Sequence, residues 1–149
     1  MRKQFNSEFL AENLAAYYED NPAATFKVAW TAYVNNFLPL SEAAAAVGVT
    51  FKQFLELGKH YTNNIKVDIP EVLLTNATPD EKFLIRCLPQ RLINILEQLL
   101  VKDILLPMSN RYIGTLWEDM RLLKRLKLVR ETKRTDLYQY SLNLNNRMK

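Results

Sequence analysis

The sequence predicts a mainly α-helical protein with a small β-hairpin near its C-terminal end. Apolar residues recur at the three- and four-residue spacing of a helix over most of the chain, and only 3 of the 149 residues are glycine. Residues 137–142 instead alternate in the manner of a strand, directly after a short charged turn. The apolar share of 48% is typical of a globular protein, and no apolar run approaches the ~20 residues that cross a membrane.

Residues 1–62 are expected to form a helical lobe, whose first helix is predicted to begin near Ser7. Asn21 followed by Pro22 then indicates the start of a second helix, because Asn is a good cap and proline is favoured at the first helical position. Pro39 is expected to end that helix. Its aromatic residues share one face and are predicted to pack in the core rather than to form a ligand cage: Phe26, Trp30, Tyr33 and Phe37.

Residues 40–59 have the pattern of two helices joined by a tight turn. Ser41 is predicted to cap a short helix, and Gly48 stands where a left-handed residue is needed after it. The segment resembles the helix-turn-helix family at Ala44, Val47, Gly48, Val49, Phe54 and Leu57. The resemblance implies that the second helix contacts DNA, with Lys52 and Gln53 as the candidate residues. The alternative is a helix pair that only packs on the other lobe or on a partner.

Residues 63–78 are predicted to be a linker or a connecting strand, because a short alternating run ends at Pro70. A second domain is expected over residues 79–149. Its first helix should begin with a capping box between Thr78 and Glu81 and break at Pro89. A further helix is predicted from its apolar face: Leu92, Ile95, Leu96, Leu99 and Leu100.

The segment from Leu88 to Leu142 carries a longer pattern. It contains the helix just described, at residues 92–101, an apolar triplet at 104–106 and an amphipathic stretch at 109–126. The sequence Lys-Leu-Val-Arg at residues 127–130 then leads into a first candidate strand, and a basic turn at 133–136 precedes a second candidate strand at 137–142. This order resembles the winged-helix family. The resemblance implies a recognition helix followed by a two-stranded β wing with residues 133–136 at its tip. The short interval before Gly114 implies that the family's second helix, at residues 109–113, is truncated or fused to the recognition helix.

Charge is distributed unevenly along the chain. Residues 121–149 carry nine Lys or Arg against two acidic residues, whereas residues 1–120 carry 11 basic and 14 acidic ones. This asymmetry favours a polyanionic partner over a solvated basic surface without one. Together with the resemblance it predicts a double-stranded DNA-binding regulator of transcription or replication, of the phage or plasmid kind. The expected DNA-binding residues of this part are Asn110, Arg111, Thr115, Arg121, Lys124, Arg125, Lys133 and Arg134.

An interaction module that docks on a protein is the alternative, for example a phage-type inhibitor or adaptor of a host protein. Glu118 and Asp119 on the expected recognition helix favour it, because they would repel nearby phosphates. Phe51 and Leu55 favour it too, because they place apolar side chains on the outward face of the other candidate helix.

Neither an enzyme nor a metal or cofactor site is expected. His60 is the only histidine and is predicted to lie at a helix end, and the three glycines are too scattered for a phosphate-binding loop. Cys87 is the only cysteine, so no internal disulfide can form, and it is predicted to be a buried thiol. A cytoplasmic location without a signal peptide is therefore expected.

Self-association is expected through the N-terminal lobe. The apolar residues at the beginning of this lobe supply more surface than one helix face can bury: Phe5, Phe9, Leu10, Leu14, Tyr17 and Tyr18. These residues predict a homodimer, in keeping with the twofold dimers common among winged-helix regulators. The alternative is that they cover the second helix of the same chain.

Overall fold

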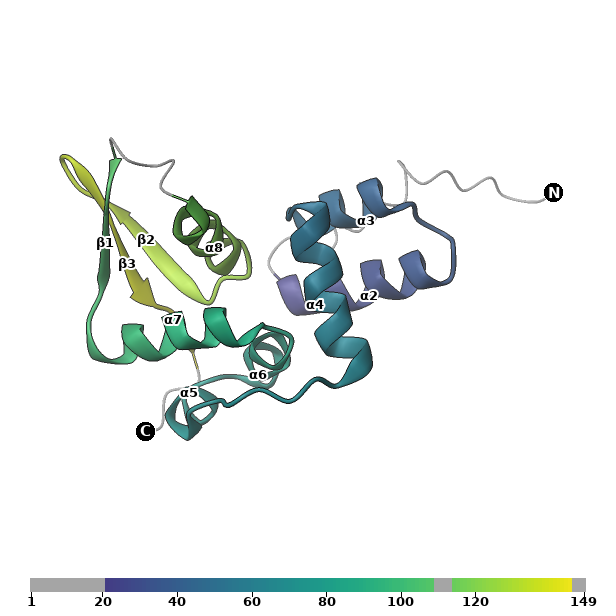
Figure 1. Ribbon diagram of the computed structural model, residues 1–149, viewed down its shortest axis with the longest axis horizontal. Helices are drawn as coiled ribbons and strands as arrows, with labels where there is room; N and C mark the ends of the chain where they lie inside the picture. The colour runs from purple at the N-terminus through teal and green to yellow at the C-terminus, as the bar shows by residue number, and fades with distance from the viewer. Residues whose placement is uncertain (1–20, 109–113, 146–149) are drawn as a thin grey trace. The chain divides into compact units, whose positions relative to one another are not determined.

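The computed structural model describes residues 21–108 and 114–145 of the chain (Figure 1). These residues are mainly helical, with a three-stranded antiparallel sheet in the C-terminal part, and the mainly α class is thereby confirmed. Residue contacts divide the chain into two units, residues 1–58 and 59–149, with the boundary inside one helix. None of the described helices is both long and apolar enough to span a membrane. The helix expected from Ser7 and the predicted dimer contacts lie outside the described residues.

The first unit contains helices α2 (Pro22–Val34) and α3 (Leu40–Val47) and most of α4 (Phe51–Asn63). Helix α2 begins as predicted, because the Asn21 side chain accepts a hydrogen bond from the backbone N–H of Ala24 at 3.0 Å. The turn between α3 and α4 is also as predicted. Gly48 has a φ of 84°, a left-handed conformation that costs glycine little because it has no Cβ.

Aromatic side chains build the core of this unit. Phe26 and Phe54 are completely buried, and their rings meet edge to face with centroids 5.6 Å apart. Trp30 packs directly against the backbone of α4 at Gly58, where an added Cβ would lie 2.1 Å from a ring carbon. A side chain at this position would therefore separate α2 from α4. Leu57 completes the buried face of α4, as the sequence predicts.

Two sequence expectations for this unit are wrong. Ser41 does not cap α3, because the helix begins directly after Pro39 without a side-chain cap, and the Ser41 hydroxyl donates to the Glu42 carboxylate at 3.1 Å. Phe37 does not join the aromatic core. Helix α2 already ends at Val34, and the turn that follows leaves Phe37 71% exposed.

The second unit begins within α4 and contains three further helices before its sheet, namely α5 (Glu71–Thr75), α6 (Pro79–Arg86) and α7 (Gln90–Val101). Helix α5 lies inside the predicted linker, and no strand forms at residues 65–69. The backbone there is held by a side chain instead, since the Asp68 N–H donates to Gln90 Oε1 at 2.7 Å and Gln90 Nε2 donates to the Asp68 carbonyl at 2.9 Å. An alternating sequence forms a strand only when a neighbouring strand is available to pair with it.

Helix α6 starts with the predicted capping box. The Glu81 N–H donates to the Thr78 hydroxyl at 3.2 Å, and the Thr78 N–H donates to the Glu81 carboxylate at 2.9 Å. The same carboxylate accepts hydrogen bonds from the backbone and the side-chain amide of Asn145, which fixes the chain after the last strand. The break at Pro89 is confirmed as well, and the expected buried face of α7 forms except at Leu100, which is only partly buried.

The sheet contains β1 (Ile104–Pro107), β2 (Val129–Lys133) and β3 (Leu137–Leu142), in the spatial order β1-β3-β2 with both pairs antiparallel. The predicted strand and hairpin are thus present. Helix α8 (Gly114–Arg125) precedes the hairpin. Two residues after it, Lys127 has a φ of 63° and turns the chain toward β2. The buried residues of α8 face the core of the second unit: Asp119, Met120, Leu122 and Leu123, followed by Leu126.

Candidate nucleic-acid interface

Helix α8 has a cationic exposed side. The buried residues of α8 face inward at helical spacing, and Arg121, Lys124 and Arg125 are exposed on its other side together with Glu118. Trp117 lies on the same side and is half-buried. This side of α8 therefore combines three basic residues with one acidic and one aromatic residue.

Two contacts fix this side of α8 to the hairpin. Lys124 Nζ donates to Glu131 Oε1 on β2 at 2.7 Å, and the ring of Trp117 meets the ring of Tyr138 on β3 with centroids 5.6 Å apart. Lys133 is paired with Tyr138 across the two strands and lies on the same side of the sheet as Glu131. We call the surface made by Trp117, Arg121, Lys124, Arg125, Lys133 and Tyr138 the α8–wing face.

Glu131 is the carboxylate of β2 that contacts the α8–wing face through Lys124. Burial alone would raise the pKa of its carboxyl group, but hydrogen bonds from Lys124 and Tyr140 and the positive charges of Lys124 and Arg121 outweigh burial and lower it. The Tyr140 hydroxyl donates to Glu131 Oε2 at 2.7 Å. Burial and the neighbouring carboxylate raise the pKa of Tyr140 above its ordinary value. Glu131 is therefore a charged carboxylate held between a buried phenol and an exposed ammonium group.

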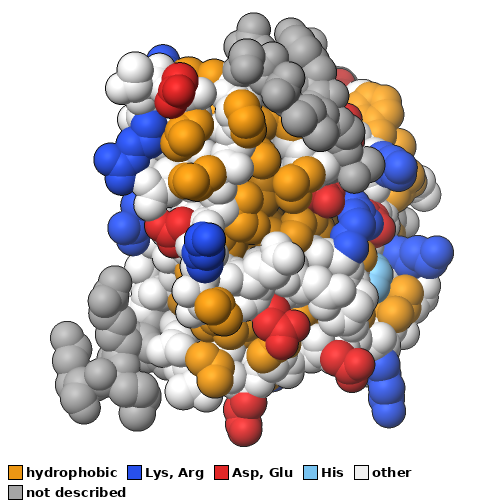
Figure 2. All heavy atoms as spheres, turned by 60° about the vertical axis from the view of Figure 1, so that its left-hand side comes forward, with side chains coloured by type: hydrophobic (Ala, Val, Ile, Leu, Met, Phe, Trp, Pro, Cys, Tyr) orange, Lys and Arg blue, Asp and Glu red, His pale blue; other side chains and the backbone are white. Residues whose placement is uncertain are grey.

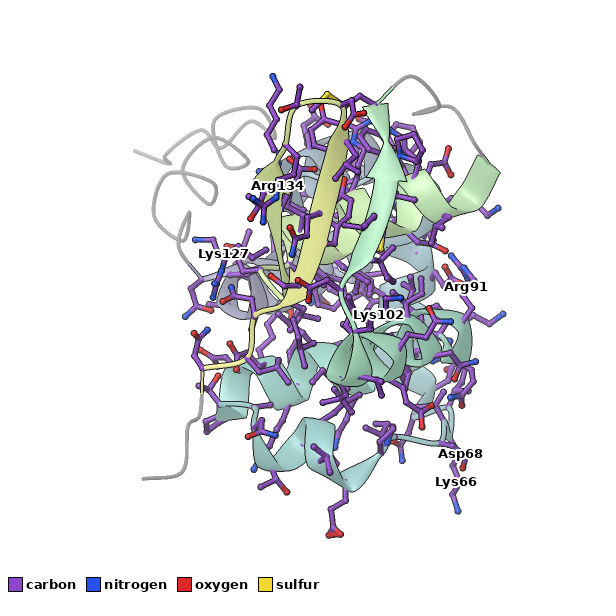
Figure 3. The ribbon with its side chains drawn as sticks, turned by 90° about the vertical axis from the view of Figure 1, so that its left-hand side faces the viewer. Lys66, Asp68, Arg91, Lys102, Lys127 and Arg134 are labelled. Carbon is purple, nitrogen blue, oxygen red and sulfur yellow. The ribbon has the colours of Figure 1, made fainter. Side chains whose placement is uncertain are left out.

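The structure brings Lys133, but not Arg134, to the α8–wing face. The Arg134 guanidinium donates two hydrogen bonds to Gln139 Oε1, at 2.8 and 2.6 Å, and Gln139 Nε2 donates to Asp103 Oδ2. Gln139 alternates with Tyr138 and Tyr140 along β3, so this chain of hydrogen bonds runs over the opposite side of the sheet. Figure 3 shows Arg134 beside the hairpin.

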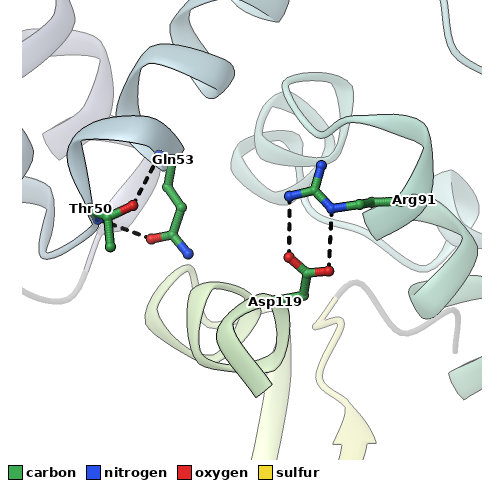
Figure 4. Close-up of polar contacts among 4 residues, drawn as sticks. All are labelled: Thr50, Gln53, Arg91 and Asp119. Carbon is green, nitrogen blue, oxygen red and sulfur yellow. Dashed lines mark hydrogen bonds and ion pairs between the residues drawn. The ribbon is translucent and has the colours of Figure 1, made fainter. Parts of the chain in front are cut away.

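Asp119 does not belong to the exposed side of α8. It is 5% exposed and accepts two hydrogen bonds from the Arg91 guanidinium of α7, at 3.2 and 3.3 Å (Figure 4). Its charge is therefore paired inside the second unit. Of the two acidic residues that the sequence places on this helix, only Glu118 is exposed.

The two candidate residues of the first unit differ in their environment. Lys52 is exposed, whereas Gln53 forms a reciprocal cap at the start of α4. The backbone N–H of Gln53 donates to the Thr50 hydroxyl at 3.1 Å, and that of Thr50 donates to Gln53 Oε1 at 3.0 Å (Figure 4). Phe51 and Leu55 are 54% and 38% exposed, as expected from the sequence. The outward side of α4 thus carries apolar side chains beside its exposed lysines Lys52 and Lys59.

Three predicted site residues cannot be placed. Asn110 and Arg111 lie outside the described residues, and the Thr115 side chain, although its backbone belongs to α8, lies outside them as well. In the described part of the chain no three His, Cys, Asp or Glu side chains gather as metal ligands. Cys87 is buried, and His60 lies in the last turn of α4, with its Nδ1 buried and without a hydrogen-bond partner among the described residues.

Apolar side chains also reach the surface of the second unit. Val101, at the end of α7, is 88% exposed and Leu105, on the edge strand β1, is 53% exposed. The space-filling view shows hydrophobic side chains at the surface together with Lys and Arg (Figure 2). Exposed apolar residues are common on folded proteins, so these two do not define a site by themselves.

Sequence reasoning missed three residues that shape the α8–wing face, namely Trp117, Glu131 and Tyr138. Trp117 precedes Arg121 by one helical turn, a spacing that already places both on one side of α8. Glu131 and Lys133 alternate along β2, which places them on one side of the sheet. Comparison of the chain with protein-family models, with curated proteins and with solved structures finds no match.

Proposed function

We propose that the second unit is a winged-helix module that binds double-stranded DNA through the α8–wing face. The order α7, β1, α8, β2, β3 and the sheet order β1-β3-β2 support this assignment. In it α8 takes the place of the recognition helix and the β2–β3 hairpin that of the wing. A role as a regulator of transcription or replication is the biological form of this proposal.

The observation that carries the proposal is the common orientation of helix and hairpin cations. Arg121, Lys124 and Arg125 are exposed on α8, and Lys133 is exposed on the side of β2 that also carries Glu131. The hydrogen bond from Lys124 to Glu131 joins the helix to this side of the hairpin. Lys and Arg side chains that meet phosphates release condensed counterions, which supplies most of the sequence-independent affinity for DNA. The burial of Asp119 against Arg91 removes one of the two carboxylates that would oppose such binding.

Binding to a mixed-sequence duplex over a series of salt concentrations tests this proposal. We expect the parent chain to bind at low salt, and the logarithm of its association constant to fall linearly with the logarithm of the salt concentration. The slope of this line should be shallower for the Lys133→Ala, Arg134→Ala double variant. An intact chain that binds no duplex at low salt, or a double variant that binds like the parent, would rule the proposal out.

A second candidate function is docking on another protein through α4. The specific observation is the exposure of Phe51 and Leu55, one helical turn apart, at 54% and 38%. A nuclease-treated pull-down tests it with Phe51→Ser as the variant and Lys52→Ala as the control. A partner that survives nuclease treatment and is lost only with Phe51→Ser favours docking, whereas loss of all partners on nuclease treatment favours DNA.

A further inference from the structure

We propose that Glu131 limits the affinity of the α8–wing face for DNA of any sequence, because its carboxylate competes with DNA phosphates for Lys124. This inference rests on the proposed function and assigns a specificity-determining role to a residue that does not itself attract DNA. A lower sequence-independent affinity raises the ratio between specific and non-specific binding, which is the quantity that matters for a regulator.

The geometry makes Glu131 the fixed partner and Lys124 the mobile one. The Glu131 side chain is only 16% exposed and accepts hydrogen bonds of 2.7 Å from both Lys124 Nζ and the Tyr140 hydroxyl. Tyr140 is completely buried and cannot follow a carboxylate that moves toward solvent. The Lys124 side chain is 52% exposed and carries its charge on a flexible stem.

The charge balance of the face follows from this arrangement. Glu131 stays ionised at neutral pH, since Lys124 and Arg121 lower its pKa. A phosphate that approaches Lys124 therefore also approaches a fixed negative charge. Lys124 can turn toward the phosphate, but it then gives up its hydrogen bond to Glu131 and leaves this carboxylate, with the charge of Arg121 still nearby, beside a second anion. Lys124 accordingly contributes less to DNA binding than its exposure suggests, and Lys133 contributes more.

The test measures binding of a mixed-sequence duplex over a salt series by the full chain and by Glu131→Gln. Glutamine keeps the size of the side chain and an oxygen that can accept from Tyr140, but it releases Lys124. One additional phosphate contact steepens the logarithmic salt dependence by about 0.9, which corresponds to an affinity about eightfold higher at 0.1 M salt. Glu97→Gln on α7 is the matched control, because it makes the same change in net charge at an exposed residue outside the α8–wing face.

Lys124→Gln in the Glu131→Gln background completes a double-mutant cycle and should remove most of the gain. An unchanged affinity for Glu131→Gln would overturn the inference while leaving the proposed function in place, provided that the parent chain binds. An equal gain for Glu97→Gln would overturn it too, because the effect would then come from net charge alone. If neither the parent chain nor Glu131→Gln binds the duplex, the proposed function fails and the inference fails with it.

A second comparison covers the case in which Glu131→Gln does not fold. In the otherwise unchanged chain, Lys133→Gln should reduce the slope of the logarithmic salt dependence of duplex binding by about 0.9. Lys124→Gln should reduce this slope by clearly less. Equal losses from the two lysine variants would overturn the inference. Thermal unfolding of each variant shows whether it is folded under the binding conditions.

Discussion

Arg91 of α7 and Asp119 of α8 are joined by two hydrogen bonds, and the aspartate is buried while the arginine side chain is 46% exposed. The two partners therefore depend on each other unequally. Loss of Arg91 leaves a buried carboxylate with fewer hydrogen bonds, whereas Arg91 without Asp119 can still be hydrated at its exposed atoms.

We expect Arg91→Ala to lower the free energy of unfolding by about 1–3 kcal/mol, the usual cost of a buried group that loses its partner. Asp119→Asn should cost less, because the amide oxygen can still accept a hydrogen bond from Arg91. Urea unfolding of both variants measures the difference in their free energies of unfolding. Arg86→Ala, which changes an exposed arginine of α6, is the control. A stability of Arg91→Ala equal to that of the control would contradict a stabilising role for this pair.

Gly58 is required because the Trp30 ring occupies the space that a side chain would need. Gly58→Ala places a Cβ 2.1 Å from the ring unless α2 and α4 separate, and overpacking of this kind usually costs about 1–3 kcal/mol. The higher helix propensity of alanine returns about 1 kcal/mol at most. We expect a net loss of thermal stability together with a change in tryptophan fluorescence. Lys59→Ala, at the next and exposed position of α4, should show neither effect.

The acid dependence of stability should report on Glu131. Its pKa is lower in the folded chain than the ordinary value of 4.5, so the unfolded chain binds protons more readily in this range. The stabilisation is present above the unfolded pKa and is lost as the pH falls through the folded pKa. We expect the parent chain to be more stable than Glu131→Gln at pH 7 and this advantage to shrink below about pH 4.5. A constant difference between the two proteins from pH 7 to pH 3 would contradict this assignment.

Gln53 should act through the start of α4 rather than through DNA. Gln53→Ala removes the side-chain half of the reciprocal cap with Thr50, and loss of a helix cap typically costs about 1 kcal/mol. We expect lower thermal stability and an unchanged salt dependence of DNA binding. Lys52→Ala is the control for a charge change at the neighbouring exposed position. A shallower salt dependence for Gln53→Ala at unchanged stability would assign Gln53 to the DNA interface instead.

Local signals in the sequence were sufficient for most of the elements. The cap at Asn21, the left-handed turn at Gly48 and the capping box of Thr78 and Glu81 are each decided by residues within one helical turn. Ser41 shows the limit of such reasoning, because Pro39 starts α3 without the help of a side chain.

Contacts between distant residues could not be predicted in the same way. Asp119 is separated from Arg91 by 28 positions and Asp103 from Gln139 by 36, so nothing local indicates that these side chains meet. Alternation along β2 and β3 does indicate which residues share a side of the sheet, and it would have separated Lys133 from Arg134. Alternation does not indicate which side of the sheet α8 covers. The contact between Lys124 of α8 and Glu131 of β2 therefore could not be predicted from the sequence.

The central proposal is tested most directly by the salt dependence of duplex binding for Lys133→Ala and Arg134→Ala, each measured as a single variant. Lys133 lies on the α8–wing face, whereas Arg134 is bonded to Gln139 on the opposite side of the hairpin. We expect Lys133→Ala to reduce the logarithmic slope by about 0.9 and the affinity at 0.1 M salt about eightfold, and Arg134→Ala to change both clearly less. Equal effects of the two variants, or binding by Lys133→Ala that matches the parent chain, would contradict DNA binding through the α8–wing face.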